Sequence, residues 1–183
     1  MKVIVSGLTA SGKSSLSKEI ASILGMEYFS ASSKLREILP KKDFKVWESK
    51  KGIEAVRFRL NNPKYDRKLD SFIVGLFKKS DSIVMDSWVA AWKINDKDTV
   101  KIYIKADRET RTERVSKRDN ISLKDASAFM GKKDKLTAAI YKKIYNIDIG
   151  QDLTPFDLVV DTSHLAMEDT LRICLDFISF RKE

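Results

Sequence analysis

One segment near the N-terminus constrains the fold of this chain more than any other. The residues Gly7-Leu8-Thr9-Ala10-Ser11-Gly12-Lys13-Ser14 fit the pattern G-x-x-x-x-G-K-[ST]. They stand between the apolar run Val3-Ile4-Val5, an expected buried strand, and a segment with apolar residues at helical spacing from Leu16 to Leu24. Glycines let the backbone turn so that successive N–H groups converge on phosphate oxygens, and a helix N-terminus attracts negative charge. The segment therefore predicts a phosphate-binding loop (P-loop), the alternative being a glycine-rich turn with an incidental lysine.

The chemistry of bound phosphates assigns roles within this loop. Lys13 is expected to reach the β- and γ-phosphates, and the Ser14 hydroxyl is expected to bind Mg²⁺. Asp86 ends the apolar run Ile83-Val84-Met85 and is expected to be a second Mg²⁺-binding or water-positioning carboxylate. An aspartate that caps the following turn would give the same pattern. The expected nucleotide-binding residues are Gly7, Leu8, Thr9, Ala10, Ser11, Gly12, Lys13, Ser14 and Ser15.

Short apolar runs alternate with helical patterns along the rest of the chain. Further strands are expected at residues 27–29, 83–85, 100–104 and 158–160, and helices at 66–79 and 167–180. Strands separated by helices form βαβ units, so we expect one α/β domain over residues 1–183, with a parallel sheet covered on both faces. The charged segments 31–65 and 107–146 are expected to be helical additions that cover a site.

Charge and composition limit the partners of the chain. It has 35 lysines and arginines against 26 aspartates and glutamates, and the net charge of +9 indicates anionic partners. The single cysteine excludes an intramolecular disulfide framework and a cysteine-rich zinc site. No stretch approaches the roughly 20 apolar residues of a membrane span, and the first apolar run is too short for a signal peptide. We therefore expect a cytoplasmic protein that binds no membrane.

Arginines provide the second chemical signal. Arg111, Arg114 and Arg118 are spaced i, i+3, i+7 and share one helical face. Glu109 and Glu113 stand at neither i±3 nor i±4 from them, so the stripe is expected to lack local partners and to neutralise phosphates. A salt-bridged surface helix is the alternative. Arg36 is either a solvated residue or the anchor of a second phosphate-bearing substrate, and the run Lys132-Lys133 is expected to be solvated.

Several runs follow the P-loop in a specific order. They are Ser30-Ala31-Ser32-Ser33-Lys34-Leu35-Arg36-Glu37, Asp66-Arg67-Lys68-Leu69-Asp70, Val84-Met85-Asp86 with Ala90-Ala91-Trp92, Arg111–Arg118, Tyr145-Asn146-Ile147-Asp148-Ile149 and Phe156-Asp157-Leu158-Val159-Val160-Asp161-Thr162-Ser163. This order resembles the nucleoside monophosphate kinases, and within them the archaeal-type cytidylate kinases. The resemblance covers nearly the whole chain, and the later runs are much more specific than the P-loop, which many enzymes share.

The resemblance implies transfer of a phosphoryl group from ATP, with Mg²⁺, to CMP. It implies a three-layer P-loop kinase fold with strand order 2-3-1-4-5, in which residues 31–65 form the monophosphate-binding insertion and residues 107–146 hold the lid. The catalytic residues would be Lys13, Arg111, Arg114 and Arg118, and the acceptor-binding residues would be Arg36, Asp66, Arg67 and Trp88. The partners would be ATP and a nucleoside monophosphate, with a monomeric protein and no nucleic acid.

The chain departs from the family pattern at four places. Ser87-Trp88 stand where the family usually has Gly-Arg, and Ser33 stands where it has an acidic residue. Ala138-Ala139-Ile140 occupy the place of an arginine expected before Tyr141, and Lys13 stands where this subfamily often has threonine. Trp88 would then either stack on the base of the acceptor or pack beneath the insertion.

Two other functions fit the same residues. The chain could phosphorylate another small acceptor, such as AMP or a non-nucleotide alcohol, and an alcohol would require a general base, for which Asp86 is the candidate. It could also be an ATP-binding regulator or a nucleic-acid-binding NTPase, which the positive charge permits. The chain has no recognised nucleic-acid module, which disfavours the last of these.

Overall fold

The P-loop leaves the carboxyl end of β1 (Lys2–Ser6), the central strand of a parallel sheet. The computed structural model describes residues 1–40 and 49–181, and of residues 49–51 the backbone only. The five strands of the sheet lie in the order β2-β3-β1-β4-β5, as expected. The other four are β2 (Glu27–Ser30), β3 (Ile83–Asp86), β4 (Thr99–Lys105) and β5 (Leu158–Asp161). Their register places Val5 beside Asp86, so the P-loop and that carboxylate emerge at the same edge of the sheet.

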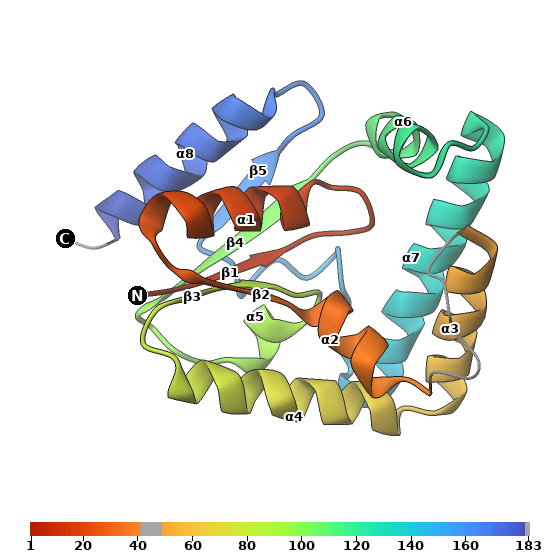
Figure 1. The fold of residues 1–183 in the computed structure, drawn as a ribbon, viewed down its shortest axis with the longest axis horizontal. Helices are drawn as coiled ribbons and strands as arrows, with labels where there is room; N and C mark the ends of the chain where they lie inside the picture. Colours follow the sequence, from red (N-terminus) through yellow and green to blue (C-terminus); the bar gives the residue numbers. More distant parts are fainter. Residues whose placement is uncertain (41–48, 182–183) are drawn as a thin grey trace.

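Alternate residues of β1 face two different helical layers. Val3 and Val5 pack in one core with residues of α1 (Lys13–Leu24) and α8 (Met167–Phe180). Ile4 packs in the other core with residues of α2 (Ala31–Ile38), α4 (Lys64–Lys79) and α5 (Ala90–Lys93). Figure 1 shows these helices on opposite sides of the sheet. The expected α/β architecture of three layers is confirmed, because the strands are apolar on both faces.

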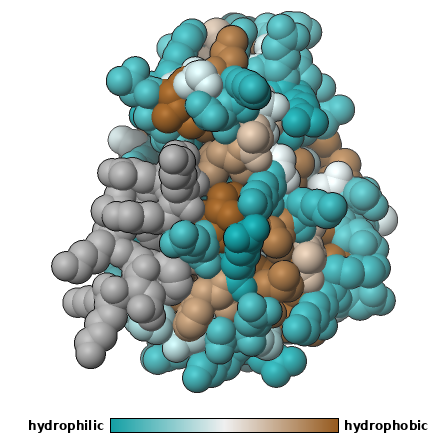
Figure 2. Space-filling view, turned by 90° about the vertical axis from the view of Figure 1, so that its right-hand side faces the viewer, coloured by the Kyte–Doolittle hydropathy of each residue, from teal (hydrophilic) through white to brown (hydrophobic). Residues whose placement is uncertain are grey.

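The remaining helices gather beside the edge of the sheet from which the P-loop emerges. They are α3 (Ser49–Asn61), α6 (Arg108–Asp119) and α7 (Leu123–Tyr145), and they lie together on the right of Figure 1. A small core of Ile53, Val115, Ala126, Phe129 and Met130 joins them, and Ala10 of the P-loop packs against this core. The surface on this side is mostly hydrophilic (Figure 2). α3, α6 and α7 thus form a separately packed cover next to the loop.

The two charged segments are helical where the structure describes them. α2 and α3 account for most of residues 31–65, although residues 41–48 lie outside the described residues. α6 and α7 account for most of residues 107–146. Their division into an insertion and a lid stays a prediction. Within the described parts of the chain, none of the helices combines the length and the apolar character needed to cross a membrane.

Candidate active site

The backbone of the P-loop has the shape that phosphate binding requires. A Cβ atom at Gly7 would collide with the backbone carbonyl of Ile104, so only glycine fits there. Gly12 has a φ of 99°, in the left-handed region, and α1 begins directly after it. Ala10 is also left-handed, with a φ of 61°. That conformation costs an L-residue roughly 1–2 kcal/mol, so the loop stores strain at Ala10.

A cavity of about 660 Å³ opens along the loop and brings most of the expected site residues together. P-loop residues 9–15 line it on one side, while Gly7 and Leu8 do not reach it. The wall also contains the sequence-predicted residues Arg36, Asp86, Trp88, Arg114 and Arg118. Because these residues come from four separate parts of the chain (the P-loop, α2, residues 86–88 and α6), tertiary packing forms the cavity.

Lys13 and its neighbours give the loop end of the cavity its charge. Burial lowers the pKa of Lys13, and the carboxylates of Asp86 and Asp134 counteract part of that effect. The Lys13 ammonium lies 5.4 Å from the centre of the Trp88 ring. A partly desolvated ammonium has lost hydration, so it interacts strongly with an anion that enters the cavity.

Ser14 and Asp86, the two residues expected to bind Mg²⁺, lie in contact with each other. The Ser14 hydroxyl donates a hydrogen bond to Oδ2 of Asp86, and Asp86 is buried at the end of β3. Hard oxygen donors of this kind suit Mg²⁺, which usually takes one or two protein ligands and completes its shell with phosphates and water. The described residues contain no group of three or more His, Cys, Asp or Glu that could hold a metal on its own. The donor set therefore fits Mg²⁺ that arrives with a nucleotide.

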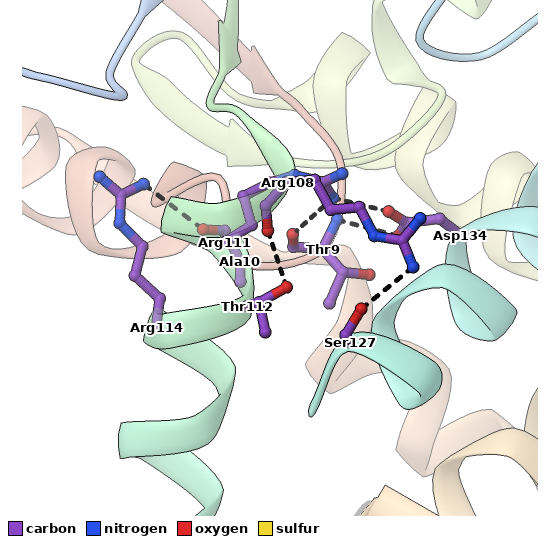
Figure 3. A network of polar contacts seen from close by, with 8 residues as sticks. All are labelled: Thr9, Ala10, Arg108, Arg111, Thr112, Arg114, Ser127 and Asp134. Carbon is purple, nitrogen blue, oxygen red and sulfur yellow. Dashed lines mark hydrogen bonds and ion pairs between the residues drawn. The ribbon is translucent and has the colours of Figure 1, made fainter. Parts of the chain in front are cut away.

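Two arginines of α6 bind the P-loop itself. Arg111 Nη1 donates to the carbonyl oxygen of Thr9 at 3.0 Å, and it pairs with Oδ2 of Asp134 on α7 at 2.6 Å. Arg114 Nη1 donates to the carbonyl of Ser11 at 3.1 Å, and its Nη2 donates to the carbonyl of Thr162 at 3.0 Å. Figure 3 shows both guanidinium groups directed at the loop. Arg114 lines the cavity as well, whereas Arg111 does not.

The expectation that the arginine stripe lacks local partners is wrong at Arg118. Its Nε and Nη2 donate to the two carboxylate oxygens of Asp119, at 2.7 Å and 2.8 Å. The two residues are adjacent in the chain, so the helical spacings i±3 and i±4 do not reveal this pair. Arg118 still lines the cavity beside Asp119. Arg118 thus lines the cavity, and Arg114 both lines the cavity and binds the P-loop. Arg111 binds the P-loop but does not line the cavity.

Two of the residues expected to bind the acceptor, Asp66 and Arg67, do not line the cavity. Asp66 is fully buried and accepts hydrogen bonds from Arg59, with Nη2 to Oδ1 at 2.5 Å and Nε to Oδ2 at 3.2 Å. Arg59 lines the cavity, but neither Asp66 nor Arg67 does, and Arg67 is exposed on α4. The helical phase of α4 turns Asp66 inward and its neighbour Arg67 outward. As a correction, Asp66 reaches the cavity only through Arg59, and the structure does not bring Arg67 to it.

Trp88 was expected either to stack on a base in the cavity or to pack beneath the insertion, and its surroundings have features of both. It lines the cavity, and it packs with Val89, Tyr141 and Ile149. One part of the ring is therefore held by apolar neighbours while another borders the cavity. Such an arrangement fixes the ring, which a stacking surface needs.

Sequence reasoning missed Lys133. It lines the cavity near Lys13 and Arg118, whereas its neighbour Lys132 is exposed. Burial and the positive charges of Lys13 and Arg118 lower the pKa of Lys133 to about 8. The expectation of a solvated pair is therefore wrong for Lys133. The sequence does indicate that Lys133 points inward. It follows Phe129 by four residues and Met130 by three, which places it on the apolar face of α7.

Arg59 and Thr162 were missed for a different reason. Thr162 Oγ1 lies 3.3 Å from the carbonyl oxygen of Ser11 and 3.1 Å from that of Lys105. Its single proton can be donated to either, so Thr162 joins the end of β4 to the loop. Both residues line the cavity. No local pattern marks either of them, since their partners lie in other segments of the chain.

Comparison with known proteins places this site in a family. The model of the cytidylate kinase-like family matches residues 3–164. The chain belongs to the cytidylate kinase-like family. A cytidylate kinase from Pyrobaculum aerophilum is 38% identical over 175 residues, which cover 96% of this chain and 91% of the relative. One from Sulfolobus acidocaldarius is 32% identical over 179 residues, covering 98% and 94%. Membership in the cytidylate kinase-like family places the chain among nucleotide kinases.

Solved structures support the fold of this cytidylate kinase-like chain. A shikimate kinase from Bacteroides thetaiotaomicron has a TM-score of 0.60 at 9% identity, with 98% of each chain covered. A deoxyadenosine kinase from M. mycoides has a TM-score of 0.56 at 17% identity, covering 98% of this chain and 99% of the other. At such low identity these likenesses concern the P-loop kinase fold alone.

Proposed function

We propose that the chain transfers the γ-phosphoryl group of ATP to a pyrimidine nucleoside monophosphate, with CMP as the first candidate and UMP or dCMP next. The observation that carries this proposal is the single cavity that runs from the P-loop to Arg36 and Trp88. A kinase of this type must hold two nucleotides at once with their phosphates adjacent. The name cytidylate kinase, which the relatives share, supports CMP as the acceptor.

The donor nucleotide would lie along the P-loop. Its phosphates would accept hydrogen bonds from the loop amides and meet the ammonium of Lys13. The base would lie near Arg114, where Leu165 and Met167 line the same end of the cavity. Apolar side chains beside a guanidinium plane offer an aromatic base a surface on which to pack.

Mg²⁺ would be held by Ser14 and Asp86. When bound, it would supply positive charge to the oxygens of the β- and γ-phosphates. Asp86 keeps the Ser14 hydroxyl oriented toward the same point by accepting its hydrogen bond. These two residues would therefore fix the donor phosphates relative to the loop.

The reaction would be an in-line attack by a phosphate oxygen of the acceptor on the γ-phosphorus. That oxygen is already anionic, so no general base is required, and the protein contributes alignment and neutralisation of charge. Lys13, Lys133 and Arg118 line the cavity and are available for the donor phosphates. Arg36 would anchor the acceptor phosphate on the opposite side.

An alcohol acceptor fits the site less well. Among the described residues, the cavity wall contains two carboxylates, Asp86 and Asp119. Asp86 accepts a hydrogen bond from Ser14, and Asp119 is paired with Arg118. In this proposal Asp86 would also be committed to Mg²⁺, so neither carboxylate would serve as the general base that an alcohol needs. The cytoplasmic location and the monomeric state stay predictions.

A screen of acceptors tests the proposal directly. Purified protein, ATP and Mg²⁺ would be incubated with CMP, dCMP, UMP, AMP or a non-nucleotide alcohol, and release of ADP would be measured. We expect the fastest release with CMP and one molecule of CDP formed per ADP. Release of ADP with an alcohol but with none of the monophosphates would contradict the proposal.

A further inference from the structure

The peptide groups of Thr9 are held by two side chains from the cover of the site. The Thr9 N–H donates to Oδ1 of Asp134 at 3.2 Å, and the Thr9 carbonyl accepts from Arg111 at 3.0 Å. Asp134 and Arg111 also bind each other at 2.6 Å. Figure 3 shows the three residues in contact, with Arg111 on α6 and Asp134 on α7. One residue of the P-loop is thus bound through both its N–H and its C=O by an ion pair that joins two helices.

This ion pair is poorly placed to bind phosphate. Its side chains are only 11% exposed for Arg111 and 14% for Asp134, and neither residue lines the cavity. The two opposite charges lie in contact and largely cancel at the distance of the cavity. Its direct effect therefore falls on the backbone of the loop.

The loop needs such support at the next residue. Ala10 adopts the left-handed conformation, which its Cβ atom disfavours. Thr9 on one side of Ala10 is bound by the ion pair, and the carbonyl of Ser11 on the other side accepts from Arg114. A strained residue persists only where its surroundings hold it in place. Both neighbours of Ala10 are held in this way.

We propose that Asp134 and Arg111 are positioning residues that keep the strained P-loop in its phosphate-binding conformation, so that the packing of α6 and α7 sets the affinity of the loop for nucleotide. The inference rests on the proposed function in that it takes ATP as the ligand. It gives Asp134 a role. It also changes the expected role of Arg111, which would hold the P-loop in shape and would not bind phosphate itself.

A double-mutant cycle between Asp134 and Ala10 tests the mechanism. Asp134→Asn keeps the size of the side chain and removes its charge, so we expect the Kd for ATP with Mg²⁺ to rise about tenfold. Glycine adopts the left-handed conformation without a penalty. Adding Ala10→Gly to Asp134→Asn should therefore restore at least threefold of the lost affinity. Arg111→Lys keeps the positive charge but loses the planar set of guanidinium donors, and it should behave like Asp134→Asn. If Asp134→Asn does not fold, Arg111→Lys takes its place in the cycle.

The matched control is Ser127→Ala. Ser127 accepts a hydrogen bond from Arg108 at 3.0 Å, so this contact also joins α7 to α6 but does not touch the loop. We expect the Kd for ATP to change less than twofold. An equal loss of affinity in Ser127→Ala would show that any weakening of the cover has this effect, and it would overturn the proposal.

Amide hydrogen exchange of the ligand-free protein separates this inference from the proposed function. Asp134→Asn should speed exchange in residues 8–12 at least tenfold and leave β1 unchanged, whether or not the protein binds ATP. Failure of the wild type to bind ATP would therefore count against the proposed function alone. Unchanged exchange in the loop, or the same loss of affinity with and without Ala10→Gly, would overturn the positioning role.

Discussion

Lys133 lies where several positive charges of the cavity converge. Burial and the nearby Lys13 and Arg118 lower its pKa to about 8. A group with this pKa loses its proton just above neutral pH, whereas an ordinary lysine keeps it until about pH 10.4. A bound polyphosphate favours the protonated form, so binding and protonation of Lys133 are linked.

This linkage predicts how affinity changes with pH. Below pH 8 Lys133 is charged and contributes to binding. Above pH 8 Lys133 must take up a proton when ATP binds, so the affinity for ATP should fall. Lys133→Arg keeps the charge at all accessible pH values and should flatten the profile between pH 7 and 9. The measurement is the Kd for ATP with Mg²⁺ at several pH values. An equally steep profile in Lys133→Arg would exclude Lys133 as the titrating group.

Trp88 lines the cavity and supplies a ring, and no charge, where we propose that the acceptor binds. Stacking on an aromatic side chain is worth about 1–3 kcal/mol per base and tolerates any ring. We therefore expect kcat/KM for CMP, UMP and AMP to lie within about tenfold of one another, a gap of roughly 1.4 kcal/mol. Trp88→Arg should widen this gap in favour of CMP, whereas Trp88→Phe, which keeps a ring, should not. Strong CMP selectivity that Trp88→Arg leaves unchanged would rule out stacking.

At the scale of the element, the arginines on successive turns of α6 make different contacts. Arg111 and Arg114 bind carbonyls of the loop, and Arg118, one turn further on, borders the cavity. The Arg118–Asp119 pair is half exposed on the arginine side, so it adds little to stability. In the proposed reaction, Arg118 is therefore the arginine of this helix that we expect to act on the transferred group.

Replacing Arg118 should affect the chemical step. We expect Arg118→Ala to lower kcat on the order of 10²-fold, as for other arginines that stabilise a phosphoryl-transfer transition state, and to leave Tm nearly unchanged. Steady-state kinetics with CMP would measure this, with Arg172→Ala, on the exposed side of α8, as the control. A rise in KM without a change in kcat would mean that Arg118 binds the ground state instead.

Most elements of the fold could be predicted because their signals are local. The apolar runs of β1, β3 and β4 mark strands buried on both faces. The helix α8 has the expected bounds, and residues between Leu171 and Ile178 pack in the core. The P-loop was recognisable because glycine, lysine and serine at fixed spacing serve one ligand. These are properties of neighbouring residues, which a sequence displays directly.

The parts of the site that could not be predicted depend on distant contacts. Asp66 and Arg67 are adjacent, and only the packing of α3 against α4 shows that Asp66 holds Arg59 at the cavity while Arg67 points away. Arg111 pairs with a carboxylate 23 residues further along the chain. Lys133 was an exception, since the apolar face of its own helix indicated that it points inward.

At the scale of the whole molecule, the cavity lies between the sheet and the helices α3, α6 and α7. A ligand that fills it would contact both parts and would stabilise the native state. A ligand that binds only the native state at about 100 times its Kd adds about 2.7 kcal/mol to the free energy of unfolding. For a domain of this size each kcal/mol raises Tm by roughly 2–4 °C. ATP with Mg²⁺ should therefore raise Tm by about 5–10 °C, as measured by thermal denaturation.

Lys13→Ala provides the comparison for this experiment. It removes the charge that we propose meets the β- and γ-phosphates, so most of the shift in Tm should disappear. The variant without ligand should melt close to the wild type, because the buried ammonium of Lys13 is held at a cost in desolvation. An undiminished shift in the variant would contradict the assignment of the loop.

The partners of the P-loop have a consequence for the order of events during synthesis. The loop occupies residues 7–14, but Asp134 lies 125 residues after Thr9, and Thr162 lies 151 residues after Ser11. Contacts across such separations close late, because long stretches of chain must first be ordered. A nascent chain on the ribosome therefore carries the whole loop sequence long before it can bind nucleotide. We therefore expect affinity for ATP only after the segments that carry Asp134 and Thr162 have emerged and docked.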